Sequence, residues 1–264
     1  MPKETFSGGD DDKGGAPPPK KKLVLHKFGL APDVNIRDVF WRIMASYAAT
    51  KKPGIDLGEM KHEATAILRV ALAVVSNQGS EDYGLSPRFV VYYTMMMVID
   101  SGWNNAFVDF LLLSADQKEG VKKEITNGLK KIITQEKYVQ EITKQLTAML
   151  RTRDSAGIAL EYIATLKSIQ LINALKKELI IIARGDIGEN QFNAIKAISL
   201  IKEDDEVKKS LITLLSHWDV QTRKEAVETL KDLIGDSEVK AAAEKRLPYE
   251  NDSEIKAILT KLAK

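Results

Sequence analysis

The sequence predicts an all-α protein in which an N-terminal helical bundle is followed by a C-terminal α-solenoid of stacked helix pairs. The first observation is a repeat: Asp219–Arg223 is echoed by Asp252–Lys256, and Glu238–Lys240 is echoed upstream by Glu206–Lys208. The second is that apolar residues recur within these repeats at steps of three and four, the period of a helix. The length of the repeat and the helical spacing within it are typical of stacked helix pairs.

The composition is that of a folded, cysteine-free protein. The chain has 264 residues, of which 44% are apolar and 29% charged, and this is too apolar for a wholly disordered chain. Its net charge of +2 means that contact with a nucleic acid or a membrane surface must be local. The absence of cysteine excludes disulfides, cysteine-ligated metal centres and a cysteine nucleophile, and it fits the reducing cytoplasm in which we expect the protein.

The most apolar stretch of the chain is too short to cross a membrane. It runs only from Phe89 to Ile99, whereas a membrane-spanning helix needs about 20 residues. We interpret this stretch as part of a buried core helix and expect no membrane partner.

Residues 1–30 are predicted to form a disordered basic arm, because their glycine and proline runs disfavour regular structure and they offer little apolar surface. We weigh two interpretations of the arm. In one, its lysines contact phosphates of a nucleic acid or a ribonucleoprotein assembly, with Arg151 and Arg153 as further contacts. In the other, the arm is a solvated terminus that only aids solubility. The lysines concerned are Lys20, Lys21, Lys22 and Lys27.

Residues 31–150 are predicted to form a helical N-terminal domain. Ser86 and Pro87 are a helix start signal, with Ser86 as the N-cap and Pro87 at the first helical position. The helix from Pro87 to Asp100 is apolar almost all round, so we expect it at the centre of the domain. Apolar stripes at helical spacing place the first four helices at residues 36–50, 57–76, 87–100 and 103–114.

The second part of this domain, residues 116–150, is richer in lysine and glutamate. We expect two amphipathic helices that part near Thr134 and Gln135. Glutamates at positions 119, 124 and 136 interleave with the lysines, so we favour a solvated face with ion pairs between side chains at i,i+4 spacing over a basic face. The lysines concerned are Lys122, Lys123, Lys130 and Lys131.

Residues 151–264 are predicted to be the repeat array. Asp154 or Ser155 is expected to open its first helix, and a single second helix is expected to run from Ile169 to Ile182. The remaining helices are expected to pair in order, and the last, unpaired one serves as a polar cap. They cover residues 192–201, 207–215, 222–234, 239–247 and 255–262.

Four residues of one repeat, Asp219, Arg223, Ala226 and Leu230, resemble HEAT repeats at this spacing, in particular the short HEAT-like repeats of the phycobilisome-lyase type. The resemblance covers about residues 154–264 and does not extend to the N-terminal half. It implies a solenoid in which Asp219 and Arg223 link helix starts and an alanine lets neighbouring helices approach closely. It further implies a scaffold that binds protein or, in some members, a nucleic acid along a basic concave face.

The sequence holds no recognisable catalytic, metal-binding or cofactor-binding pattern. It has no phosphate-binding glycine loop and no dinucleotide fingerprint. His62 and Glu63 match the start of a helical zinc motif, but Ala66 occupies the position of its second histidine. We therefore expect a non-enzymatic protein without a cofactor, metal or small-molecule substrate. An enzyme hidden in the N-terminal bundle stays open.

His217 and Trp218 fall in a turn between two helices of the array. An exposed tryptophan there could anchor a partner, because tryptophan is enriched in interface hot spots. We favour the alternative, in which Trp218 packs over the neighbouring repeat. The leading hypothesis is an adaptor or scaffold that binds a protein or a macromolecular assembly. The alternative is a nucleic-acid or ribosome-associated protein that uses residues 20–27.

Overall fold

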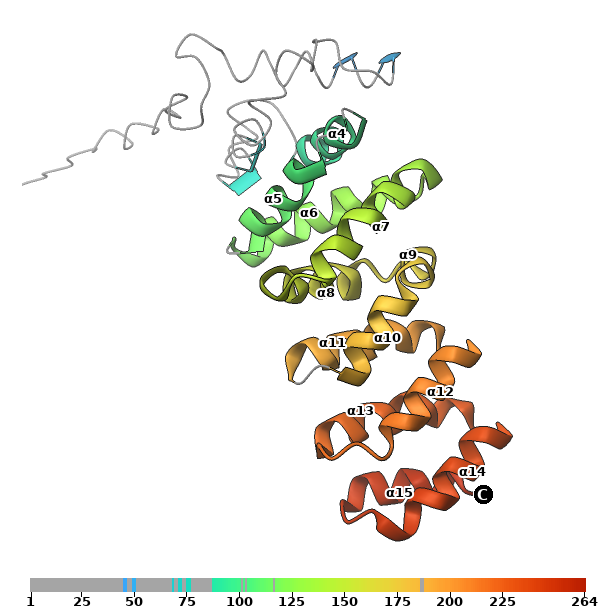
Figure 1. Cartoon of the computed structure of the whole chain (residues 1–264). Coiled ribbons are helices and arrows are strands. Elements are labelled where there is room, and N and C mark those ends of the chain that lie inside the picture. Colours follow the sequence, from blue (N-terminus) through green and yellow to red (C-terminus); the bar gives the residue numbers. More distant parts are fainter. Residues whose placement is uncertain are drawn as a thin grey trace, which may run out of the picture.

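The computed structural model describes residues 45–46, 49–50, 68, 71–72, 75–76, 87–100, 102, 104–115, 117–185 and 188–264. Within these residues the protein is helical and has no strand, which confirms the all-α class. Figure 1 shows the helices stacked in a repeat-like array that extends from α4 to α15. The predicted arm and most of the first two predicted helices lie outside the described residues.

The central helix of the N-terminal part is α4 (Pro87–Asp100), whose bounds match the prediction. Every residue from Val90 to Val98 is buried, so its methionines fill the core. The following helix, α5 (Asn104–Ala115), packs on α4 and begins one residue later than predicted.

The helices α6 (Glu119–Ile132) and α7 (Glu136–Leu150) part where the sequence predicts. Gly128 lets α4 cross α6 at close range. A Cβ atom at this position would lie 2.4 Å from Cγ1 of Val91, well inside van der Waals contact. The absent side chain therefore sets how closely the two helices approach.

The next segment differs from the prediction at two points. Helix α8 (Arg153–Leu166) has Thr152 as its N-cap, and the hydroxyl of Ser155 donates to the carbonyl of Met149 instead of capping. The helix predicted over 169–182 is two helices, α9 (Ile169–Ala174) and α10 (Lys176–Gly185). Leu175 separates them, and its N–H bonds to the carbonyl of Leu171.

The C-terminal repeats are built from helices that begin at aspartate caps. The side chains of Asp204, Asp219, Asp236 and Asp252 each accept a hydrogen bond from the backbone of the first turn, which satisfies amides that lack a helical partner. Within the acidic run at 203–206, Asp204 is thus the cap of α12. The elements are α11 (Glu189–Ile198), η3 (Ser199–Ile201), α12 (Asp205–Leu214), α13 (Val220–Leu230), η4 (Lys231–Leu233), α14 (Ser237–Arg246), η5 (Leu247–Tyr249) and α15 (Ser253–Leu262).

The close helix pairs are offset by one helix from those predicted. Of the helices that follow one another in the array, α10 packs on α11, α12 on α13 and α14 on α15. The helices α8, α11, α13 and α15 stack in one layer, which we call the inner layer, and we call α10, α12 and α14 the outer helices. The predicted partners α11 and α12 make few backbone contacts with each other, as do α13 and α14. The short helix η3 follows α11 directly, and η4 follows α13. Ile234, the last residue of the helix predicted over 222–234, follows η4 and is 65% exposed.

A ladder of ion pairs links successive repeats. Lys176 of α10 binds Asp204 at 2.9 Å, and Lys208 of α12 binds Asp236 at 2.9 Å, one repeat further along. Each lysine thus reaches the N-cap of the following outer helix. The hydrogen bond from the lysine lowers the pKa of both aspartates below their usual value. Because these pairs are partly exposed, we assign them to fixing the register of the repeats more than to stability.

The crossing of α4 and α6 makes a testable prediction. Gly128→Ala should lower the free energy of unfolding by about 1–3 kcal/mol, because the new methyl group collides with Val91. Gly120→Ala in the same helix is the control: nothing lies within 4 Å of its Cβ position, so it should leave stability unchanged or raise it by up to about 1 kcal/mol. Urea denaturation measures both. Equal stability of the two variants would show that the crossing adapts freely.

Candidate functional site

Two turns on one side of the array expose aromatic side chains. Trp218 lies between α12 and α13 and is 71% exposed, and Tyr249 ends η5, between α14 and α15, and is 72% exposed. Because α13 and α15 stack in one layer, the turns that precede them lie on the same side of the molecule (Figure 1). Val220, at the start of α13, is 45% exposed. We call the surface formed by His217, Trp218, Val220 and Tyr249 the aromatic edge.

The exposure of Trp218 overturns the interpretation that we favoured from the sequence. Its ring does not pack over the neighbouring repeat. Its aromatic neighbour is His217, with ring centroids 5.4 Å apart and planes inclined by 32°. Nδ1 of His217 accepts a hydrogen bond from the backbone of Asp219 at 3.2 Å, which orients the imidazole. The role of Trp218 as a partner anchor stays a prediction.

A buried arginine holds the two aromatic turns together. Nε and Nη2 of Arg223 donate to the two carboxylate oxygens of Glu250, at 2.8 and 3.0 Å. Nη1 donates to the backbone carbonyls of His217 and Trp218, at 2.9 and 3.0 Å. The side chain of Arg223 is only 9% exposed, and that of Glu250 is fully buried. One guanidinium therefore fixes the Trp218 turn and, through Glu250, the turn that bears Tyr249.

Glu250 is fully satisfied in its buried position. Besides the two bonds from Arg223, its carboxylate accepts hydrogen bonds from Arg246 at 3.1 Å and from the backbone of Asn251 and Asp252 at 2.9 and 3.0 Å. Burial alone raises the pKa of the Glu250 carboxyl, but the bonds from Arg223, Asp252 and Arg246 outweigh it and leave the pKa at about 2. Glu250 is therefore charged under all ordinary conditions.

A second polar network continues under α13 toward the preceding repeat. Asp219 accepts from the backbone of Thr222 at 2.7 Å, and the hydroxyl of Thr222 lies between Asp219 and Gln191. Gln191 is almost completely buried and donates to the carbonyl of Ala183 at 3.0 Å. In the preceding repeat it occupies the position that Arg223 occupies in its own. Both residues thus reach from the first turn of an inner helix to another segment of the array.

These contacts sharpen the expected role of Asp219 and Arg223. Each acts at a helix start, but Arg223 bonds to Glu250, and no hydrogen bond joins it to Asp219 among the described contacts. Sequence reasoning missed Glu250 and Tyr249. Glu250 stands two residues before the Asp252 cap, as His217 stands before the Asp219 cap, and this position alone gave no sign that Glu250 is the partner of Arg223.

The other candidate residues lie apart from this edge or outside the description. Arg151, at the junction of α7 and α8, bonds to Glu178 at 2.7 Å, and Arg153 is an exposed first residue of α8. The arm residues Lys20, Lys21, Lys22 and Lys27 lie outside the described residues. Their phosphate contacts stay a prediction.

Side chains that could hold a metal ion are not grouped in the part of the chain that the structure describes. Within it, no three His, Asp or Glu side chains come together as a metal site would need. No helix that the structure describes is long and apolar enough to span a bilayer. No protein-family model matches the chain, and no curated protein shows significant similarity to it.

The buried carboxylate predicts a characteristic pH dependence. Glu250→Gln should lower the free energy of unfolding at pH 7, because Arg223 then lacks its charged partner. A depressed folded-state pKa contributes stability that is present above the unfolded pKa of 4.5 and is lost as the pH falls toward 2. The gap between wild type and variant should therefore be constant above about pH 5.5 and shrink below about pH 4.5. Urea denaturation from pH 7 to 2.5 measures it, and a gap that stays constant would contradict the assignment.

Proposed function

We propose that the chain is a non-enzymatic adaptor in which HEAT-like repeats present the aromatic edge to a protein partner. The HEAT-like assignment is supported by the repeat that relates Asp219 to Asp252, the aspartate caps and the buried Ala194 and Ala226 in the inner layer. The partner assignment is supported by one main observation, the exposure of Trp218 and Tyr249 on a fixed backbone.

Exposed aromatic residues of this kind are unfavourable to leave in water. Two large rings and a valine are exposed on one edge of the array, and exposed apolar side chains that gather on one face are typical of association sites. Tryptophan and tyrosine are also among the residues most enriched in binding hot spots. A structural role does not account for either ring, since each is more than two-thirds exposed.

The rigid support of the edge favours binding. Arg223 and Glu250 hold both turns through bonds that are largely inaccessible to water, so a partner would meet a surface that is already ordered. Less conformational entropy is then lost on association. Neighbouring helices in a layer lie about 8–10 Å apart, which sets the approximate separation of the two aromatic turns. A partner with two apolar side chains about 10 Å apart fits, and two turns of a helix span that distance.

The proposal is tested with full-length protein as bait in a native lysate. The double variant Trp218→Ala/Tyr249→Ala should bind its partner at least about tenfold more weakly, because each ring is a candidate hot spot. The control is Ile169→Ala/Ile181→Ala, which removes two similarly exposed apolar residues elsewhere, at 58% and 69% exposure. Quantitative mass spectrometry of the retained proteins, after nuclease treatment, is the readout.

A set of proteins retained by wild type and by the isoleucine control, but not by the aromatic variant, would support the proposal. The same retained proteins for all three baits would refute it. So would a partner that a parallel sample without nuclease retains and the nuclease-treated sample loses.

A further inference from the structure

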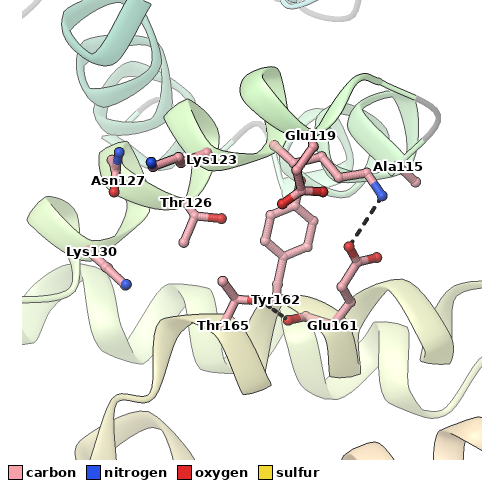
Figure 2. Close-up of a pocket in the computed structure, with 10 residues that line it drawn as sticks. Ala115, Glu119, Lys123, Thr126, Asn127, Lys130, Glu161, Tyr162 and Thr165 are labelled. Atoms are coloured by element: carbon pink, nitrogen blue, oxygen red, sulfur yellow. Dashed lines mark hydrogen bonds and ion pairs between the residues drawn. The ribbon is translucent and has the colours of Figure 1, made fainter.

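A basic surface crosses α6, far along the chain from the aromatic edge. On one side of α6, facing α8, a pocket of about 170 Å³ is lined by lysines, an asparagine and Tyr162 (Figure 2). Its basic residues are Lys122, Lys123 and Lys130, and its acidic residues are Glu119 and Glu161. The pocket has room for several waters, each of which takes about 30 Å³ in the liquid, and so for a phosphate group.

The charges in this pocket are separated. Lys122 is neutralised by Glu161 of α8, at 3.2 Å. Figure 2 shows Lys123, Asn127 and Lys130 gathered on the side away from Glu119 and Glu161. No ion pair joins Lys123 or Lys130 to any described residue. Half of the pocket therefore carries positive charge that no ion pair within the described residues neutralises.

A second pocket lies on the other side of α6, toward α4, and shares Asn127 with the first. It measures about 390 Å³ and is lined by Arg88, Phe89, Tyr92, Asn127, Gly128 and Lys131. Nζ of Lys131 lies 4.5 Å from the centre of the Tyr92 ring, and Arg88 pairs with Glu124 at 3.0 Å. Because Gly128 brings α4 against α6, residues from both helices meet here. We call these two pockets, which share Asn127 as a lining residue, the α6 groove.

This arrangement differs from the solvated face that the sequence favoured. Among the described residues, no ion pair forms between side chains at i,i+4 spacing within α6. Instead Glu124 pairs with Arg88 of α4, and Glu161 of α8 pairs with Lys122. The remaining lysines, Lys123, Lys130 and Lys131, keep their charge available along one path.

We propose that the α6 groove binds the phosphate backbone of single-stranded nucleic acid. Three lysines supply the charge that phosphates require, and the Asn127 side-chain amide, between the two pockets, is placed to donate to a phosphate oxygen. A flexible strand can bend across one helix from pocket to pocket, which a stiff duplex cannot do. The Tyr92 ring is buried and covered by Lys131, so it offers no stacking platform. Recognition is therefore by charge and independent of sequence.

This site goes beyond the proposed protein-binding function and uses different residues. It also places the phosphate contacts on α6, whereas Arg151 lies at the junction of α7 and α8 and Arg153 begins α8. Its test is therefore separate from that of the aromatic edge: Trp218→Ala/Tyr249→Ala should bind nucleic acid like wild type.

The probe is a fluorescein-labelled oligouridine RNA of about 20 nucleotides, and the readout is fluorescence anisotropy between about 50 and 200 mM salt. Lys123→Gln/Lys130→Gln/Lys131→Gln should bind at least about tenfold more weakly at the lowest salt. The slope of log affinity against log salt should also become shallower by about 2, because each of the three lost phosphate contacts contributes about 0.7. The matched control, Lys209→Gln/Lys245→Gln/Lys256→Gln, removes the same charge from exposed lysines of the repeats and should change affinity less than about twofold. Thermal unfolding verifies that both variants fold.

Four results would overturn the proposal. They are an absence of wild-type binding, equal weakening by the control variant, equal binding of a duplex of the same length, or loss of binding in Lys20→Gln/Lys21→Gln/Lys22→Gln while the α6 variant binds normally. The last result would assign the contact to the arm.

Discussion

The buried pair of Arg223 and Glu250 is the interaction on which the candidate docking surface depends. Removing both charges from water is costly, and the cost is offset only because the polar atoms involved find partners. Such a pair adds little to the free energy of unfolding, since a well-packed apolar pair of similar volume would stabilise the fold as much. What it provides is position: the guanidinium holds the carbonyl of Trp218, and the carboxylate holds the backbone that follows Tyr249.

The rest of the array is organised around simpler contacts that repeat with the sequence. Aspartate caps start the helices, and lysines of α10 and α12 reach the cap of the next outer helix. These pairs set the spacing between repeats, and the Arg223 pair then ties two inner-layer turns at that spacing. The α6 groove follows from a different constraint, the missing side chain of Gly128, which draws α4 onto α6. Protein binding and phosphate binding are thus proposed at surfaces that two independent packing features create.

Much of the helical architecture was predictable because it depends on local pattern. Pro87 and the apolar run mark α4, and the change of apolar spacing near Gln135 marks the break between α6 and α7. Aspartates mark the starts of the late helices. Two misses are local, the N-cap of α8 and the break at Leu175, and the others concern tertiary packing. Which helices pack on one another, and how much of Trp218 the neighbouring repeat leaves uncovered, depend on contacts between residues far apart in the sequence. Glu250 could not be assigned to Arg223 because nothing local distinguishes it from a surface glutamate.

If one buried arginine orders both aromatic turns, amide hydrogen exchange in wild type and Arg223→Met will show it most directly. We expect the amides of His217, Asn251 and Asp252 to lose protection together, by about tenfold or more, while the Glu206 amide at the Asp204 cap keeps its protection. Loss at one turn only would contradict the coupling of the two turns through Arg223. Equal loss throughout the array would show that Arg223 supports global stability and has no specific role at the aromatic edge.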